Sequence, residues 1–355
     1  LFFTKCGAMK KNTFIIGKRK IGENYKPLII AEIGINHSGS IEKAIKIADA
    51  AIKSGAEVIK HQTHIVDDEY SYHAKKTKPG NSSKTIYEII KNNSLDEENE
   101  YKLMKYITGK NKIFLSTPFS RKAVDRLIKF RVSAFKIGSG ECNNLPLVNY
   151  ISKFKKPIIL STGMNNIKSI KESLKIINKY NTKVALLHCT NLYPTNPKFV
   201  RLGAMTTMMK EFKKNVIGLS DHTRDIYTSL GAIALGACII EKHFTFSKKS
   251  KGPDISSSLD GSEFKKLIEG ANEIFLAKGG KKTPLKEEKK TINFAFASVV
   301  TIRKIKKGEK FSEENIWVKR PAGGDFSAKD FHKVVGKKAS RNIQLDEQIK
   351  RKDIV

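Results

Sequence analysis

The sequence has few of the residues that build cross-linked or membrane-embedded proteins. It holds four cysteines and no Cys-x-x-Cys pair among its 355 residues. This pattern argues against a disulfide framework and a zinc ribbon, and it favours a reducing compartment. No apolar run approaches the roughly 18 residues of a membrane-spanning helix. The opening LFFTKCGAM is too short for a signal peptide, and Met9, before two lysines, is a candidate start that would make residues 1–8 non-native. We therefore expect a cytoplasmic protein with no membrane segment.

Acidic residues and arginine are also scarce. The chain carries 67 Lys and Arg against 35 Asp and Glu, a formal net charge of +32, and only 10 of the 67 cations are arginine. Nucleic-acid recognition favours the planar arginine fork, and no nucleic-acid-binding motif is visible. We interpret the lysine excess as surface composition and expect no nucleic-acid partner. A competing hypothesis, in which the protein is not an enzyme, is a basic protein that binds nucleic acid or a surface and is built on an inert barrel. Its affinity for DNA would fall steeply as the salt concentration rises.

Short β-rich runs alternate with amphipathic helical stretches through most of the chain. Each run has a hydrophobic centre of about four residues, as in strands buried on both faces of a parallel sheet. Eight such cycles over roughly 250 residues predict a (β/α)8 TIM barrel of the α/β class. An open doubly wound sheet is the alternative, but no G-x-G-x-x-G opens the first helix. The strand candidates are 27–34, 56–63, 112–118, 134–140, 157–163, 184–190, 215–221 and 237–243.

The remaining segments divide the chain into parts. We expect an N-terminal extension over 1–20, the barrel over 21–280, a polar linker over 281–291 and a small separate domain over 292–355. Residues 64–95 form a long insertion after the second strand, with a helix predicted at Thr85–Lys91. Long loops at the active face of a barrel are often lids or substrate walls.

Polar residues stand at the C-terminal end of almost every predicted strand. This end of a (β/α)8 barrel carries the active site. Some of the hydroxyls are expected only to cap the next helix, with Ser120, Thr162 and Thr190 the main candidates. The polar residues at the strand ends are Glu32, Asn36, His37, Lys60, His61, Gln62, Ser116, Thr117, Lys136, Ser139, Ser161, Thr162, His188, Thr190, Asn191, Tyr193, Ser220, Asp221, His222, Glu241 and His243.

Two histidines and two lysines in this set suggest specific chemistry. His222 and His243 follow neighbouring strands, so their imidazoles could hold Mn, Fe, Co or Zn, or could be metal-free and hydrogen-bonded. Glu241 could polarise a bound water or a substrate hydroxyl, or it could simply be neutralised by Lys60 or Lys136. Either lysine could form an imine, but two lysines amid several hydroxyls favour binding of a phosphate and a carboxylate.

Several motifs occur in an order and spacing that resemble the sialic acid synthase family. They are IAEIGINHSGS, VIKHQTHIVDDE, LSTPFSR, FKIGSGECNN, LSTGM, HCTNLYP, IGLSDHT and IEKHFT. The stretch from FAFASVV to VVGKKA resembles that family's C-terminal antifreeze-like (SAF) domain, a β-clip fold. The resemblance covers residues 14–355 and is strongest to the bacterial N-acetylneuraminate synthase branch.

The resemblance implies a reaction and a set of roles. Phosphoenolpyruvate, N-acetylmannosamine and water would give N-acetylneuraminate and phosphate, with Mn²⁺ as the typical metal. Glu241, Glu32, Lys60 and Lys136 would be catalytic, and Arg320 would enter the partner subunit's barrel in a domain-swapped homodimer. His222 and His243 match the metal ligands. The phosphoenolpyruvate side is matched by Lys60, Thr117, Lys136, Ser139, Ser161, Asn191 and Ser220, and the sugar side by Glu32, Gln62, Tyr193, Glu241 and Asp254.

The sequence departs from the family pattern near the last strand. Phe246 replaces an expected aspartate, and ISSSLD, which includes Ser256–Ser258, replaces an expected IVCSMD. This loop lies over the predicted site, so the departures bear on the choice of sugar. The alternative substrate is a 2,4-diacetamido-trideoxyhexose, which would make the protein a legionaminate or pseudaminate synthase.

Overall fold

The computed structural model describes residues 12–78, 83–250, 252 and 254–355. The candidate start at Met9 and residues 1–8 lie outside this range. The chain divides into two compact units, one ending at Gly279 and the other spanning Gly280–Val355.

Eight parallel strands form the centre of the first unit and confirm the predicted (β/α)8 barrel. Their pairing order is β5-β4-β3-β10-β9-β8-β7-β6, and β5 and β6 at the ends of this order lie beside each other, so the sheet is a nearly closed barrel. Each strand falls within one of the eight predicted runs. The strands are β3 (Leu28–Gly34), β4 (Val58–Thr63), β5 (Ile113–Pro118), β6 (Phe135–Ile137), β7 (Ile158–Ser161), β8 (Val184–Cys189), β9 (Val216–Asp221) and β10 (Ile239–His243).

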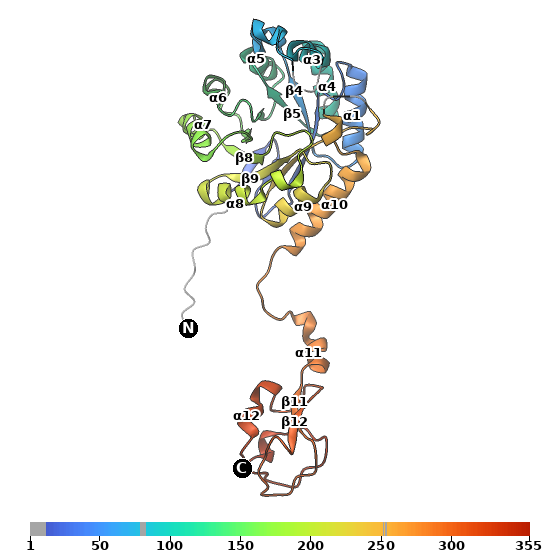
Figure 1. The fold of residues 1–355 in the computed structure, drawn as a ribbon, viewed down its shortest axis with the longest axis vertical. Helices are drawn as coiled ribbons and strands as arrows, with labels where there is room; N and C mark the ends of the chain where they lie inside the picture. The colour runs from blue at the N-terminus through green and yellow to red at the C-terminus, as the bar shows by residue number, and fades with distance from the viewer. Residues whose placement is uncertain (1–11, 79–82, 251, 253) are drawn as a thin grey trace. The chain divides into compact units, whose positions relative to one another are not determined.

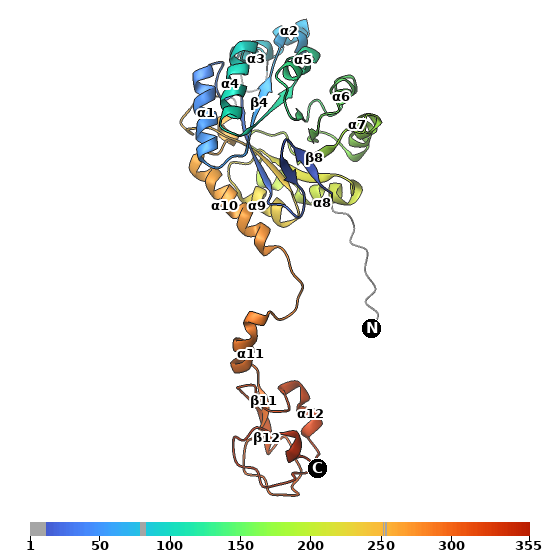
Figure 2. The ribbon, with the colours of Figure 1, turned by 180° about the vertical axis from the view of Figure 1, so that it is seen from behind.

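Helices surround these strands (Figures 1 and 2). Ser40, Ser120 and Asn166 accept hydrogen bonds from backbone N–H groups at the starts of three of them, as expected for N-cap residues. The helices are α1 (Ile41–Lys53), α4 (Glu97–Gly109), α5 (Arg121–Lys129), α6 (Leu145–Ser152), α7 (Ile167–Lys179), α8 (Leu202–Glu211), α9 (Tyr227–Ala234) and α10 (Gly261–Ala277).

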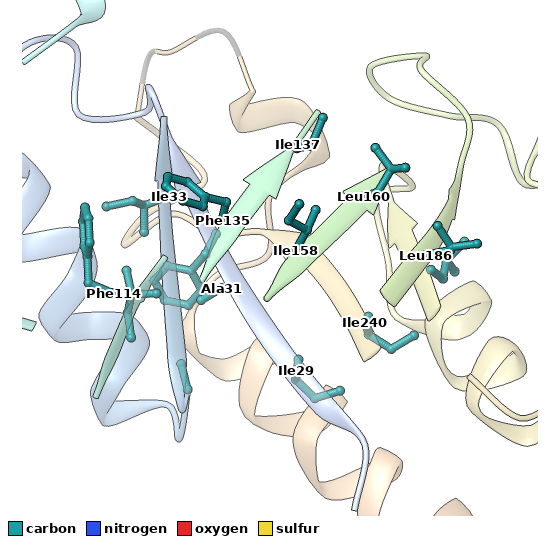
Figure 3. Close-up of a cluster of buried hydrophobic side chains, with 14 of the residues drawn as sticks. Ile29, Ala31, Ile33, Phe114, Phe135, Ile137, Ile158, Leu160, Leu186 and Ile240 are labelled. Atoms are coloured by element: carbon teal, nitrogen blue, oxygen red, sulfur yellow. The ribbon is translucent and has the colours of Figure 1, made fainter. Parts of the chain in front are cut away.

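Alternate residues of each strand point in opposite directions, and this alternation creates two separate cores. The outward residues pack against the helices, and Figure 3 shows members of this cluster, including Ile33, Phe135 and Leu160. Burying each such side chain stabilises the fold by about 1.5–3 kcal/mol. Inward residues of the lower strand halves, such as Ile30 and Leu187, form a second apolar core inside the barrel.

A hairpin closes the lower end of the barrel interior. Strands β1 (Phe14–Ile16) and β2 (Arg19–Ile21) pair antiparallel, and Phe14, Ile16 and Ile21 belong to the inner core. The sequence analysis placed Phe14 and Ile16 in an N-terminal extension and Ile21 at the start of the barrel. All three side chains are buried in the inner core, so the hairpin packs as part of the barrel unit.

The described part of the insertion after β4 contains two short α-helices, in addition to a 3-10 helix at Tyr72–Lys75. They are α2 (Val66–Glu69) and α3 (Ile86–Asn93), and the latter matches the helix predicted at Thr85–Lys91. Val66 and Ile90 pack with Ile35 in a small apolar cluster. The insertion is therefore anchored next to the C-terminal end of β3.

The second unit has a small core of its own. Strands β11 (Ser298–Thr301) and β12 (Ile316–Lys319) pair antiparallel, and short helices α11 (Lys289–Ala295) and α12 (Phe331–Val334) accompany them. Val299, Phe311 and Ile316 lie in its apolar centre. Among the described residues of both units, none of the helices is long and apolar enough to cross a membrane.

Candidate active site

Two lysines and two glutamates face one another in the upper half of the barrel interior. The Nζ of Lys60 lies 2.9 Å from Glu32 Oε2 and 3.8 Å from Glu241 Oε2. The Nζ of Lys136 lies 3.7 Å from Glu241 Oε1. All four side chains are at most 7% exposed. These distances agree with the second interpretation of Glu241, in which its carboxylate neutralises the lysines. The same ion pairs also hold both ammonium groups at the barrel mouth.

Hydroxyl groups complete the surroundings of the lysines. Lys60 Nζ donates to Thr117 Oγ1 at 3.2 Å, and Lys136 Nζ donates to Ser161 Oγ at 2.7 Å. Ser220 Oγ donates to Glu241 Oε1 at 2.9 Å. Ammonium and hydroxyl groups that converge in the buried barrel interior are suited to a small polyanion.

The environment moves the pKa values of the two glutamates apart. Burial raises the pKa of Glu32 to about 7 against the opposing effect of Lys60. Burial alone would also raise the pKa of Glu241, but Lys136 and Lys60 hold it below its usual range. Burial lowers the pKa of Lys136. Glu241 is thus ionised at neutral pH, whereas Glu32 is close to the point at which it gains a proton.

His222 and His243 lie side by side at the mouth, with ring centroids 5.3 Å apart. Burial lowers the pKa of His222 to about 4 and that of His243 to about 3, so both rings are neutral. His222 Nδ1 lies 3.0 Å from the Thr190 carbonyl, which can only accept, so this nitrogen donates and Nε2 keeps its lone pair. His243 Nδ1 is buried and has no hydrogen-bond partner among the described residues.

These imidazoles fit a divalent cation, although they do not form a complete ligand set. Neutral imidazole is a common ligand of transition metals. Within the described part of the chain, no group of three or more His, Cys, Asp or Glu is arranged to hold a metal. Asp254 Oδ2 is 3.7 Å from His243 Nδ1. Further ligands would therefore come from water or substrate.

Three polar side chains converge above Gly34. Gln62 Nε2 donates to Glu32 Oε1 at 2.8 Å. A Cβ at Gly34 would lie 3.2 Å from Glu32 Oε1, 3.3 Å from Gln62 Nε2 and 3.4 Å from Asp254 Oδ2. Gly34 also has a φ of +50°, a conformation that other residues rarely adopt. The sequence analysis did not single out this glycine, although it is the last residue of the predicted first strand.

The other predicted substrate-binding residues border the same region. Tyr193 stacks on His222 with ring centroids 4.1 Å apart. Ser139 Oγ accepts a hydrogen bond from the Gly163 N–H at 3.0 Å, and the Asn191 side chain packs against the same glycine. Arg320 is different, because it is an exposed residue after β12 in the second unit.

Not all polar residues at the strand ends enter the interior. His61, Ser116, His188 and Asp221 point outward, because they alternate with inward residues of the same strands. His61 Nδ1, for example, lies 3.1 Å from Glu100 Oε1 of α4. Their position near the C-terminal ends of the strands was correctly predicted, but their orientation separates them from the lysines and carboxylates.

Two further residues near the site were missed. His64 follows Gln62 by two residues, and its Nε2 lies 3.1 Å from Gln62 Oε1. Cys189 occupies the inward position at the end of β8, with its Sγ 3.2 Å from Asn191 Oδ1. The two-residue alternation along each strand was the signal that could have identified both.

The sequence departures are explained by local contacts. Phe246 is partly exposed, and Lys46 Nζ lies 4.3 Å from the centroid of its ring. Ser258 Oγ donates to the Asp254 carbonyl at 2.8 Å and accepts from Asn36 Nδ2 at 3.0 Å. Ser258 thus ties the loop that carries Asp254 to Asn36, whereas the buried Ser257 Oγ has no hydrogen-bond partner among the described residues.

Proteins of known name resemble this chain over most of its length. The N,N'-diacetyllegionaminic acid synthase of Campylobacter jejuni is 42% identical over 92% of this chain and 99% of its own. The pseudaminic acid synthase of the same species is 36% identical over 92% and 96% of the two chains. The crystal structure of N-acetylneuraminic acid (sialic acid) synthetase from Leptospira borgpetersenii superposes with a TM-score of 0.73 at 29% identity, covering 79% of this chain and 95% of that one.

Two family matches cover most of the sequence. Residues 47–283 match the NeuB family, and residues 296–355 match the SAF domain. The match to the second unit confirms the SAF domain that the tail motifs predicted. The chain therefore belongs to the NeuB, or sialic acid synthase, family and carries a TIM barrel followed by a C-terminal SAF domain.

Proposed function

We propose that this protein condenses phosphoenolpyruvate with an open-chain 2,4-diacetamido-2,4,6-trideoxymannose and water, giving a legionaminate-type sugar acid and phosphate. The observation that best supports this proposal is the pair of buried ammonium groups, Lys60 and Lys136, which lie among hydroxyls at the C-terminal end of the barrel strands. Such a pocket suits an anion with several negative charges. Phosphoenolpyruvate is available in the cytoplasm, where we expect the enzyme to act.

The choice of sugar differs from the one that the sequence motifs favoured. Those motifs indicated N-acetylmannosamine, but the relative with 42% identity over 99% of its length is named as a diacetyllegionaminic acid synthase. This likeness supports the diacetamido sugar. N-acetylmannosamine remains the second candidate, supported by the likeness to the Leptospira enzyme.

The residues of the barrel would divide the chemistry as follows. Lys60 and Lys136 bind the phosphate and carboxylate and stabilise their charge, with Thr117 and Ser161 as further donors. The new bond joins C3 of phosphoenolpyruvate to the aldehyde carbon of the sugar. Water adds to C2, and the bond between C2 and the phosphate oxygen breaks. Glu241 or Glu32 holds the proton exchanged at the new hydroxyl or at the water.

His222 and His243 would hold a divalent cation, for which we propose Mn²⁺. When bound there, the cation supplies Lewis acidity toward the sugar carbonyl. The neutral rings and the unpaired His243 Nδ1 support this assignment. Exhaustive treatment with EDTA and His222→Ala should each abolish phosphate release and leave the melting temperature of the barrel nearly unchanged. Full activity after both treatments would refute the metal site.

Phosphate release with each sugar tests the substrate. The purified chain is incubated with phosphoenolpyruvate, Mn²⁺ and either the diacetamido sugar or N-acetylmannosamine. We expect a kcat/KM at least about 100-fold higher for the diacetamido sugar, the discrimination possible when a buried polar partner is lost. Preference for N-acetylmannosamine would favour the second candidate, and no release with any amino sugar would refute the proposed reaction.

The homodimer is also a proposal, with Arg320 acting in the partner subunit's barrel. Arg320→Ala should raise KM for the sugar more than KM for phosphoenolpyruvate. A mixture of Arg320→Ala and His222→Ala chains tests the exchange, because a mixed dimer would combine one intact barrel with one intact arginine. Recovered activity after mixing is expected, and none would indicate that Arg320 acts within its own chain or not at all.

A further inference from the structure

A histidine–glutamate pair from the insertion lies behind the Gln62 amide. His64 directly follows β4, and Glu69 is the last residue of α2. Their side chains are 3% and 8% exposed. We infer that His64, held by Glu69, is a positioning residue that fixes which end of the Gln62 amide faces Glu32. The inference rests on the proposed function, because Gln62 matters as a sugar-side group.

The hydrogen bonds of Gln62 define the role of the first imidazole nitrogen. Gln62 Nε2 faces Glu32 Oε1 at 2.8 Å, and Glu32 Oε2 is 2.9 Å from the Lys60 ammonium. A carboxylate paired with an ammonium accepts hydrogen bonds, so the NH2 end of the amide turns toward Glu32. The oxygen of the amide then faces His64 Nε2 at 3.1 Å. His64 Nε2 therefore acts as the donor in this contact, and because Nδ1 faces the Glu69 carboxylate, the arrangement places a proton on each ring nitrogen.

The second nitrogen of His64 anchors the ring. His64 Nδ1 is 2.8 Å from Glu69 Oε2. The Tyr70 side chain also interacts with Glu69, and burial, together with the charge of Glu69, raises the pKa of Tyr70. A protonated phenol is a donor, so Glu69 is an acceptor for both neighbours. The ring also stacks on Phe119 with centroids 4.4 Å apart and planes at 9°. These contacts prevent rotation of the imidazole.

A consequence follows for the sugar side of the site. With the amide fixed, Gln62 Nε2 points to the position above Gly34 where Glu32 and Asp254 also converge. A rotated amide would present its oxygen to Glu32 Oε1, so two acceptors would face each other and the hydrogen bond would be lost. On the phosphoenolpyruvate side, Lys136 instead contacts Ser161, Glu241 and the Ile137 carbonyl, none of which belongs to the His64–Glu69 pair. Loss of the pair should therefore affect the two substrates unequally.

Steady-state kinetics of the full chain test this inequality. His64→Phe keeps a ring against Phe119 but removes both nitrogens, and we expect kcat/KM for the sugar to fall about 10- to 100-fold, as for a lost buried hydrogen bond. The KM for phosphoenolpyruvate should change less than about twofold. Glu69→Gln should give a smaller loss in the same direction. His73→Phe, at an exposed histidine of the same insertion, is the matched control and should behave as wild type.

Equal losses for both substrates, or no loss, would overturn the inference. A second readout needs neither activity nor a stable variant. In wild-type protein with isotope-labelled histidine, nuclear magnetic resonance should show a proton on His64 Nε2, and a bare Nε2 would overturn the inference. If wild type converts no sugar at all, the proposed function fails, and the spectrum still decides the role of His64.

Discussion

At the scale of single residues, the direction of a side chain decides the role of a buried lysine. Lys136 points into the barrel mouth, where it contacts Ser161 and Glu241. Lys242 lies on the outer face of β10, with its Nζ 3.3 Å from Asp221 Oδ2 and 3.1 Å from Thr223 Oγ1. Burial lowers the pKa of both lysines. Both ammonium groups are buried, but Lys136 faces the barrel interior and Lys242 faces the layer outside the strands.

Substitution of each lysine by methionine should separate these roles. Lys136→Met should reduce kcat/KM for phosphoenolpyruvate at least about 100-fold and change the free energy of unfolding by less than about 1 kcal/mol, because Lys60 still faces Glu241. Lys242→Met should lower the free energy of unfolding by about 3–5 kcal/mol, because Asp221 loses its buried cation. Urea titration and phosphate release measure the two effects. The reverse pattern would contradict the assignment of the two faces.

Gly34 gives a second prediction at this scale. Gly34→Ala should cost about 1–2 kcal/mol of stability from the positive φ and should also abolish most turnover, because the new methyl group meets Glu32, Gln62 and Asp254. Gly17→Ala is the matched control, since Gly17 has a φ of +56° in the β1–β2 turn and ample space. Thermal melts and turnover are compared for both. Similar activity in the two variants would show that the convergence above Gly34 is not needed for catalysis.

At the scale of secondary-structure elements, the β1–β2 hairpin and the insertion each complete part of the barrel. The hairpin closes the lower end with Phe14, Ile16 and Ile21. The insertion contributes α2, whose last residue, Glu69, contacts His64, and His64 in turn contacts the Gln62 amide. The hairpin, which the sequence analysis placed largely in an extension, thus supports the barrel interior. The insertion, which was predicted mainly as a loop, supports the candidate site.

Two neighbouring isoleucines of β1 test the role of the hairpin. Ile16 is 0% exposed and Ile15 is 44% exposed. Ile16→Ala should destabilise the barrel by about 2–5 kcal/mol, whereas Ile15→Ala should change stability by less than about 0.5 kcal/mol. Chemical denaturation followed by circular dichroism gives both values. Equal effects would mean that the hairpin does not form part of the inner core.

At the scale of the whole molecule, the positive charge is much larger than the site requires. The net charge is +32, while the described interior of the barrel mouth holds two lysines, Lys60 and Lys136, and both have carboxylate neighbours. The rest of the excess therefore lies elsewhere, and repulsion among like charges opposes the compact state.

Screening this repulsion should stabilise the protein. We expect the melting temperature to rise by a few degrees as sodium chloride increases from about 0.01 to about 0.3 M, because the Debye length shortens over this range. Chloride is preferable to sulfate, which also stabilises proteins by exclusion from their surface. A melting temperature that falls with salt would mean that attractive ion pairs outweigh the repulsion.

Much of the fold was predictable because it depends on local patterns. Each of the eight strands has a short apolar centre between turn residues, so β3 and β10 were found as readily as the strands between them. The hairpin was not found, because strands of three residues such as Phe14–Ile16 are too short for a clear alternation. The predicted domain-swapped dimer depends on a second chain and stays a prediction.

The barrel, the SAF domain and the polar residues at the strand ends could be inferred from the amino-acid sequence, because strand periodicity and family motifs are local patterns. Which of these residues meet follows from the folded arrangement. It brought Lys60 on β4 to Glu32 on β3 and to Glu241 on β10, and it turned His61 and Lys242 away from them. It also connected Glu69 to Gln62 through His64. The physical reason is that closure of the barrel and the alternation of its strands set side-chain direction, which residue spacing alone leaves open.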